Sequence, residues 1–204
     1  ASCTRRMRSP PGIRETIEQA KTALAVENLK EENLITELHR TPIGVCAIIT
    51  PWNFPVSMPE SLLSPALIAG NTVVFKPSEM VPLTGKAIFD IFNKHLPPGV
   101  INLVQGADEV GSHLIHSNID MIAFVGSQAV GKIIMKAAGD KLKRIVLELG
   151  GKDPMIVLND ADLEKAANFA VNGSLRNTGQ VCVSVERIYV QEKAADKFTT
   201  LVAN

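Results

Sequence analysis

The chain has 204 residues, 46% of them hydrophobic, so it can build a buried core for one or two domains. Its 21 basic side chains balance its 21 acidic ones, which leaves no net positive charge to attract nucleic acid. No apolar run reaches the roughly 18 to 20 residues that cross a bilayer, so a membrane partner is not expected either.

The N-terminal segment predicts one helix. Apolar residues fall three or four apart from Ile13 to Leu24, and we expect the helix to run from Arg14 to about Glu31. The basic residues ahead of it lack the apolar stretch of a secretory signal. A ragged terminus is the simpler interpretation of them, and the remnant of an organelle transit peptide is the alternative. No chemistry is expected of this segment.

From residue 43 onward, short apolar strands alternate with helices. The strands are expected at residues 43–49, 72–75, 100–104, 121–125 and 144–148, and the helices between them at residues 59–69, 83–95, 107–116 and 128–138. This order predicts an α/β fold with an open, doubly wound, Rossmann-like parallel sheet covered on both faces. After Gly150 and Gly151, two further strands and two further helices indicate a second α/β domain, with Asp160 and Asp162 placed to cap its first helix.

Unusual sequence motifs follow the predicted strands. They occupy residues 50–55, 76–79, 106–111 and 126–131. Ligands of open α/β sheets bind at the carboxyl ends of the strands, so this coincidence indicates a nucleotide-sized ligand. Residues 126–132 fit the first seven positions of a phosphate-binding P-loop, but Ile133 stands where Ser or Thr should hold magnesium, and we reject that motif. A helix start at Gly126 and Ser127 remains as an anion site.

Two further strand ends carry polar residues with alternative interpretations. Lys76 and Glu79 could hold a ribose or a phosphate, or they could form a surface ion pair. Asn53 lies between Pro51 and Pro55, which restrict the backbone and favour a stiff turn. A stiffly held amide suits an oxyanion, because a preorganised donor does not reorganise during reaction; an ordinary turn Asn is the alternative.

Glu148 and Cys182 are candidates for a base and a nucleophile. Glu148 ends an otherwise apolar strand, where partial desolvation would raise its pKa toward that of a useful base; a capping carboxylate is the alternative. Cys182 lies in a polar loop, as a reactive thiol would, whereas Cys46 lies in an apolar strand as a packing residue. With Cys3 these make three scattered cysteines, too few for a zinc site or a disulfide framework. We therefore expect no metal and a reducing compartment, the cytoplasm, with the mitochondrion as the alternative.

Together these motifs resemble those of the aldehyde dehydrogenase family. The resemblance covers residues 41–204, and five segments occur in the family's order and at about its spacing. They are Thr50-Pro-Trp-Asn-Phe-Pro55, Lys76-Pro-Ser-Glu79, Phe124-Val-Gly-Ser127, Leu147-Glu-Leu-Gly-Gly-Lys152 and Gly179-Gln-Val-Cys182. The third departs from the family at Val125, where Thr is usual.

The resemblance implies oxidation of a small aldehyde to a carboxylic acid. Cys182 would be the nucleophile that forms a thiohemiacetal and then a thioester, Asn53 would hold the oxyanion, and Glu148 would activate water. It implies NAD as the cofactor, with NADP as the alternative, because Glu79 would repel a 2′-phosphate. The implied cofactor contacts are Ile49, Thr50, Trp52, Lys76, Ser78, Glu79, Gly106, Gly111, Phe124, Gly126, Ser127, Gly131, Leu149 and Gly150.

The resemblance also implies how the chain is organised. Residues 1–40 form an N-terminal helical segment that we could not align, residues 41–148 the cofactor-binding domain, and residues 149–204 a partial catalytic domain. Members of the family are longer and usually homo-oligomeric, and neither their remaining catalytic motif nor their oligomerisation strands are recognisable here. We therefore expect a fragment of an active enzyme. A truncated, non-catalytic NAD-binding or interaction module is the alternative.

Overall fold

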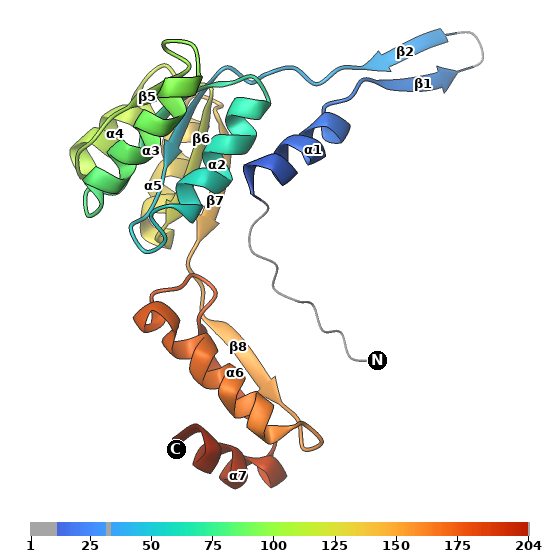
Figure 1. Ribbon diagram of the computed structural model, residues 1–204, viewed down its shortest axis with the longest axis vertical. Coiled ribbons are helices and arrows are strands. Elements are labelled where there is room, and N and C mark those ends of the chain that lie inside the picture. The colour runs from blue at the N-terminus through green and yellow to red at the C-terminus, as the bar shows by residue number, and fades with distance from the viewer. Residues whose placement is uncertain (1–11, 32–33, 204) are drawn as a thin grey trace. The chain divides into compact units, whose positions relative to one another are not determined.

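The computed structural model describes residues 12–31 and 34–203 (Figure 1). The chain divides into two compact units, the first ending at Glu148 and the second beginning at Leu149. The expectations for Cys3 and for a transit-peptide remnant lie outside the described residues.

The first unit is built on a five-stranded sheet in the order β5-β4-β3-β6-β7. Its strands are β3 (Val45–Ile49), β4 (Thr72–Lys76), β5 (Ile101–Leu103), β6 (Met121–Gly126) and β7 (Arg144–Leu149). Strand β3 pairs in parallel with both β4 and β6, and β4 pairs in parallel with β5. The chain therefore builds the sheet in one direction from β3 to β5 and then returns to β3 to build it in the other. This confirms the predicted α/β class.

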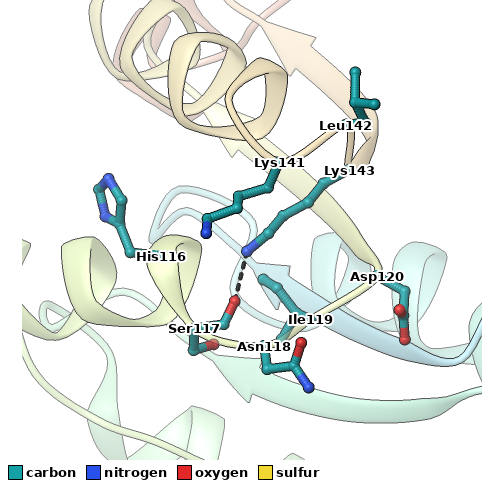
Figure 2. A pocket seen from close by; sticks show the side chains of 8 residues that line it. All are labelled: His116, Ser117, Asn118, Ile119, Asp120, Lys141, Leu142 and Lys143. Atoms are coloured by element: carbon teal, nitrogen blue, oxygen red, sulfur yellow. Dashed lines mark hydrogen bonds between the residues drawn. The ribbon is translucent and has the colours of Figure 1, made fainter.

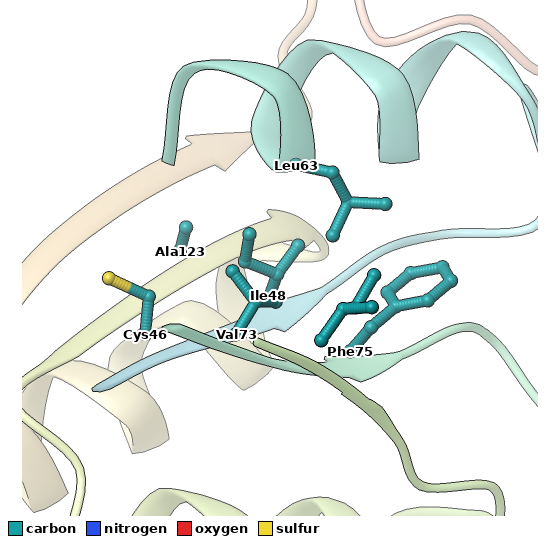
Figure 3. Close-up of a cluster of buried hydrophobic side chains, with 7 residues drawn as sticks. Cys46, Ile48, Leu63, Val73, Phe75 and Ala123 are labelled. Carbon is teal, nitrogen blue, oxygen red and sulfur yellow. The ribbon is translucent and has the colours of Figure 1, made fainter. Parts of the chain in front are cut away.

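Helices cover both faces of the sheet because its central strands are apolar on both sides. Helices α2 (Ser57–Ile68) and α3 (Pro82–His95) pack on one face, and α4 (Asp108–His116) and α5 (Gln128–Gly139) on the other. Figure 3 shows the core under α2, where Leu63 lies over Ile48, Val73 and Phe75. Leu63, Val73 and Phe75 are completely inaccessible to solvent. Burying such a side chain contributes roughly 1.5–3 kcal/mol, so this layer holds the strands in register.

Strand β7 differs from the expected buried strand. Its residues alternate between exposed and half-buried, and Glu148 is on the exposed side. The reason is that β7 forms an edge of the sheet, with β6 as its neighbour on one side only.

The N-terminal prediction was wrong beyond the first three turns. Helix α1 spans Ile13–Ala23, and it is followed by two antiparallel strands, β1 (Glu27–Glu31) and β2 (Leu34–Leu38). The Arg40 side chain closes the base of this hairpin, because it donates to the carbonyl of Ala25 at 3.0 Å and pairs with Glu27. The helical spacing of apolar residues stops at Leu24, so the pairing of the two strands decides the structure of the residues that follow.

The second unit contains a parallel pair, β8 (Asp153–Val157) and β9 (Val185–Val190), with α6 (Leu163–Leu175) and α7 (Glu192–Ala203). Its core is formed by Val157, Ala167, Ala170 and Phe198. Asp162 caps α6 as predicted, because its side chain accepts a hydrogen bond from the backbone N–H of Lys165 at 3.2 Å.

Asn71 joins the start of β3 to the turn before β4. It is 5% exposed, and its side-chain oxygen accepts hydrogen bonds from the N–H groups of Ile43 and Gly44 at 2.6 and 3.0 Å. Its side-chain nitrogen donates to the carbonyl of Ala66 at 2.9 Å. One side-chain amide thus bonds three backbone groups, and the N–H groups of Ile43 and Gly44 would otherwise lack partners.

We predict that Asn71→Ala lowers the free energy of unfolding by about 2–4 kcal/mol, because it leaves the N–H groups of Ile43 and Gly44 without partners. The matched control is Asn102→Ala, which removes an exposed bond to the carbonyl of Gly99 and should change stability by about 0.5 kcal/mol or less. Urea denaturation measures both. Equal effects of the two substitutions would contradict this role of Asn71.

Candidate functional site

The carboxyl ends of three parallel strands lie side by side in the first unit. Ile49 at the end of β3 is in register with Lys76 on β4 and with Phe124 on β6. The backbone N–H of Thr50 continues the ladder by donating to the carbonyl of Lys76 at 3.2 Å. The segments that follow β3, β4 and β6 therefore leave the sheet at one place. This place is also where the strand order reverses, the position at which open α/β sheets bind ligands.

A cavity of about 520 Å³ opens at these strand ends, and we call it the strand-end cleft. Ten of the predicted cofactor residues line it: Ile49, Thr50, Trp52, Lys76, Ser78, Glu79, Gly111, Phe124, Gly126 and Ser127. Polar groups come mainly from the strand ends, and helices α4 and α5 contribute apolar walls. A mostly apolar cleft with a few fixed polar groups is the usual form of a small-molecule site.

Lys76 is the most unusual residue of the strand-end cleft. It is 5% exposed, yet its Nζ lies 3.8 Å from the half-exposed carboxylate of Glu79 and 3.5 Å from the carbonyl oxygen of Pro77. Thr50 is 3% exposed, and its hydroxyl has no hydrogen-bond partner among the described residues. Buried polar groups normally have close partners, so hydroxyl or phosphate oxygens of a ligand would complete both.

The start of α5 forms another wall of the strand-end cleft. Ser127 caps the helix, since its hydroxyl accepts from the backbone N–H of Val130 at 3.3 Å. Gly126 precedes it, and a Cβ there would lie 2.4 Å from the ring of Phe124. The ring of Phe124 can therefore occupy this position only because residue 126 has no side chain. The amino end of a helix attracts anions through its N–H groups and its dipole, so this wall suits a phosphate.

Four predicted cofactor residues do not line the strand-end cleft in the first unit. Gly106 lies in the loop before α4, where a Cβ would meet Val110 at 2.4 Å, and Gly131 is buried within α5. Leu149 and Gly150 belong to the second unit.

Sequence reasoning missed several lining residues, namely Pro51, Ala107, Asp108, Ser112, Ile115, Val125, Val130, Ile133 and Ile134. Most lie in α4 and α5. Helical spacing from Gly111 and Ser127 could have indicated part of this set.

The candidate oxyanion donor, Asn53, and the candidate base, Glu148, also belong to the first unit, which ends at Glu148. Asn53 lies in the loop between β3 and α2 and is half-buried. Glu148 lies near the end of β7 and is exposed, so the expected desolvation of its carboxylate is not found. The cause is the position of β7 at the edge of the sheet.

The candidate nucleophile lies in the second unit. Cys182 is exposed and follows three consecutive residues with positive φ: Asn177, Thr178 and Gly179, at 49°, 60° and 77°. Hydrogen bonds hold the loop around the thiol. The buried Ser184 donates from its backbone N–H to the carbonyl of Val181 at 3.0 Å, and its hydroxyl lies 3.3 Å from the carbonyl oxygens of both Gly173 and Ser174.

The chain is similar to known proteins in both sequence and fold. The family model described as the aldehyde dehydrogenase family matches residues 7–204. The chain belongs to the aldehyde dehydrogenase family. Human aldehyde dehydrogenase 1A1 is 47% identical over 170 residues, which are 81% of this chain and 34% of that protein. The chain thus spans about a third of the length of this curated relative.

Solved aldehyde dehydrogenase structures share the fold. Betaine aldehyde dehydrogenase from Staphylococcus aureus, solved with NAD⁺, matches with a TM-score of 0.88 and 36% identity, over 94% of this chain and 39% of that one. An NADP-dependent enzyme from Escherichia coli matches with a TM-score of 0.88 and 34% identity, over 94% of this chain and 41% of that one.

The family match begins at residue 7, so it includes residues before 41 that the motifs alone left unaligned. Within residues 12–31 and 34–203, no helix is both long and apolar enough to cross a membrane. The same part of the chain contains no cluster of three His, Cys, Asp or Glu side chains that could hold a metal ion.

We predict that iodoacetamide alkylates Cys182 at least about tenfold faster than Cys46 in the folded chain. Cys182 is exposed, whereas burial, and next the negative charge of Asp120, raises the pKa of the Cys46 thiol. Peptide mapping by mass spectrometry gives both rates. Denaturation in urea is the control, because it should make the two thiols react alike. Equal rates in the folded chain would contradict the prediction.

Proposed function

We propose that this chain supplies the cofactor cleft and the nucleophile of an enzyme that oxidises an aldehyde to a carboxylic acid with NAD⁺ or NADP⁺. The observation that carries the proposal is the buried, weakly partnered Lys76, beside the unpartnered hydroxyl of Thr50, where the strand order reverses. Membership of the aldehyde dehydrogenase family supports the reaction class.

The strand-end cleft fits a dinucleotide part by part. Lys76 and Glu79 would hold the adenosine ribose, because one donates to and the other accepts from hydroxyl groups. The start of α5 at Ser127 would hold the pyrophosphate. The apolar side chains of Val130 and Ile133 would cover the adenine. When bound, the nicotinamide supplies a hydride acceptor.

The cofactor choice rests on Glu79. Its carboxylate lines the strand-end cleft and is 48% exposed, and Lys76 lies 3.8 Å away. A carboxylate at the ribose accepts hydrogen bonds from its hydroxyls and repels a 2′-phosphate. We therefore propose NAD as the preferred cofactor. Both kinds of cofactor occur in the solved relatives, as the Staphylococcus aureus and Escherichia coli structures are described with NAD⁺ and as NADP dependent.

Three residues would carry the chemistry. The thiolate of Cys182 would attack the aldehyde carbonyl, and the side-chain amide of Asn53 with the N–H of Cys182 would stabilise the oxyanion. Loss of hydride then leaves a thioester on Cys182. Glu148 would take a proton from water, and the resulting hydroxide would hydrolyse the thioester and release the acid. The exposed thiol and the loop bonds of Ser184 support the first role.

A non-catalytic NAD-binding module is the second candidate. The strand-end cleft and the core beneath it lie within the first unit, so this part of the cofactor site needs no residue of the second. Binding and turnover are therefore tested separately.

We predict that Lys76→Met weakens NAD⁺ binding by about tenfold or more, since a charge-assisted hydrogen bond contributes about 1.5–3 kcal/mol. Trp52 is the only tryptophan of the chain and lines the strand-end cleft, so its fluorescence reports the titration. Lys94→Met, on the exposed side of α3, is the matched control and should bind like the wild type. Equal affinities of all three proteins would contradict the cofactor assignment.

Turnover is predicted to depend on Cys182 and Glu148 in different ways. With NAD⁺ and a short aliphatic aldehyde, Cys182→Ala should form no NADH, because no thiohemiacetal can form. Glu148→Gln should form about one equivalent of NADH per chain and then stop, because the loss of a general base slows hydrolysis by about 10²–10⁴-fold. Absorbance of NADH measures both. Undiminished NADH from Cys182→Ala would contradict the mechanism. NAD⁺ binding without NADH in the wild type would mean that these residues do not suffice for turnover, as for a fragment of an active enzyme or a non-catalytic module.

A further inference from the structure

A second cavity of the first unit lies at the opposite end of the sheet, where β6 and β7 begin (Figure 2). It has a volume of about 340 Å³, room for roughly ten waters at about 30 Å³ each in the liquid. It is formed by the segment that links α4 to β6 and by the turn that links α5 to β7. We call it the strand-start pocket. None of the candidate catalytic or cofactor residues lines it.

The turn after α5 holds two lysines in fixed backbone positions. The N–H of Lys143 donates to the carbonyl of Ala138 at 2.9 Å, and the N–H of Leu142 donates to the carbonyl of Gly139 at 3.2 Å. Leu142 has a φ of 52°, and this combination is a Schellman motif at the end of the helix. Glycine is usual at the left-handed position, yet here a leucine occupies it with its side chain 92% exposed. The motif sets Lys141 and Lys143 on either side of that residue.

Lys143 is tethered, and Lys141 is not. The ammonium group of Lys143 donates to the carbonyls of Ile115 at 2.9 Å and Ser117 at 2.6 Å, at the end of α4. An ammonium has three N–H groups, so one remains for another acceptor. The side chain of Lys141 has no hydrogen bond or ion pair with any residue that the structure describes, and only its backbone N–H is bonded, to the carbonyl of Ala138 at 3.2 Å. Figure 2 shows both side chains at the strand-start pocket, and the charge of Lys141 acts on Lys143.

The charges of the pocket are not balanced. Burial, and next the positive charge of Lys141, lowers the pKa of Lys143, and the opposing effect of Asp120 is the smallest of the three. The Asp120 carboxylate accepts a hydrogen bond from the N–H of Val45 at 2.7 Å. Figure 2 shows that carboxylate turned away from the two ammonium groups. An external anion between the two lysines would therefore reduce the repulsion between their positive charges.

We propose that the strand-start pocket binds a small oxyanion of the phosphate class, held between Lys141 and the remaining N–H of Lys143. Asn118 lines the same pocket, and its side chain, which has no hydrogen bond with any described residue, adds a neutral donor. The volume admits either a free phosphate ion or the phosphate group of a small organic ester. The site is separate from the strand-end cleft, and its occupancy would stabilise the first unit by linking the ends of α4 and α5.

Thermal unfolding of the full chain tests the proposal. Inorganic phosphate is titrated against sodium chloride at constant ionic strength and pH. At ten times the dissociation constant the midpoint should rise by about 3–5 °C. Lys141→Met should abolish most of this rise, and the matched control Lys94→Met should keep it. The side chain of Lys141 is exposed and makes no bond with the described residues, so its substitution should leave the midpoint without phosphate unchanged.

Backbone amide shifts locate the bound anion, because phosphate could also bind at the start of α5. Shifts at residues 117–120 and 141–143 that saturate, and that vanish in Lys141→Met, would support the proposal. Shifts confined to residues 126–130, or an equal rise in midpoint for Lys141→Met and the wild type, would overturn it. A second titration with glycerol 3-phosphate distinguishes the sources: tighter binding than inorganic phosphate indicates an organic ester, and weaker or equal binding indicates the free ion.

Discussion

The pairing of β3 with β4 on one side and β6 on the other is the constraint on which the rest of the first unit depends. Because both pairings are parallel, Ile49 and Lys76 end their strands beside Phe124 of β6, although the three residues are far apart in the chain. Parallel strands need crossover helices, and these helices form the walls beside the strand ends. The strand-end cleft is therefore a consequence of strand order and not a separately assembled feature.

The positive charges at the two ends of this sheet are compensated in different ways. At the carboxyl end, Lys76 is almost inaccessible and lies 3.8 Å from its carboxylate partner, an arrangement that costs free energy until a ligand contributes acceptors. At the opposite end, Lys143 is satisfied by two backbone carbonyls, and the excess charge belongs to its neighbour Lys141. The first arrangement suits a ligand that is enclosed, and the second suits one held at the surface.

In the second unit, the position of the Cys182 thiol depends on backbone conformations and hydrogen bonds of nearby residues. Asn177 and Thr178 adopt left-handed conformations that cost roughly 1–2 kcal/mol each for residues with a side chain. Hydrogen bonds from Ser174 and Ser184 join the loop to the end of α6 and the start of β9, and these offset part of that cost. Cys182 remains exposed as a result, whereas Cys46 is 2% exposed within a strand. The same residue type thus has an exposed and a buried setting in one chain.

The sequence by itself determined the order of strands and helices from residue 43 onward and the family. Runs such as Val45–Ile49 are apolar at every position because both faces of a central strand are buried, and this pattern is legible without a structure. The motifs at the ends of these runs were equally recognisable, because Lys76 is the last residue of β4 and Ser127 is the first residue after β6. Local chemistry and local periodicity were sufficient for this part.

Only the tertiary structure decided the β1–β2 hairpin, the edge position of β7 and the walls of both cavities. The hairpin depends on pairing between Glu27–Glu31 and Leu34–Leu38 and on Arg40 at its base, none of which a helical spacing rule detects. Ile115 and Ile133 became lining residues because α4 and α5 pack on the same face. Lys143 meets the carbonyls at the end of α4 for the same reason. The contacts of Ile115, Ile133 and Lys143 join residues distant in the chain, and their energies arise only after the sheet has brought the helices together.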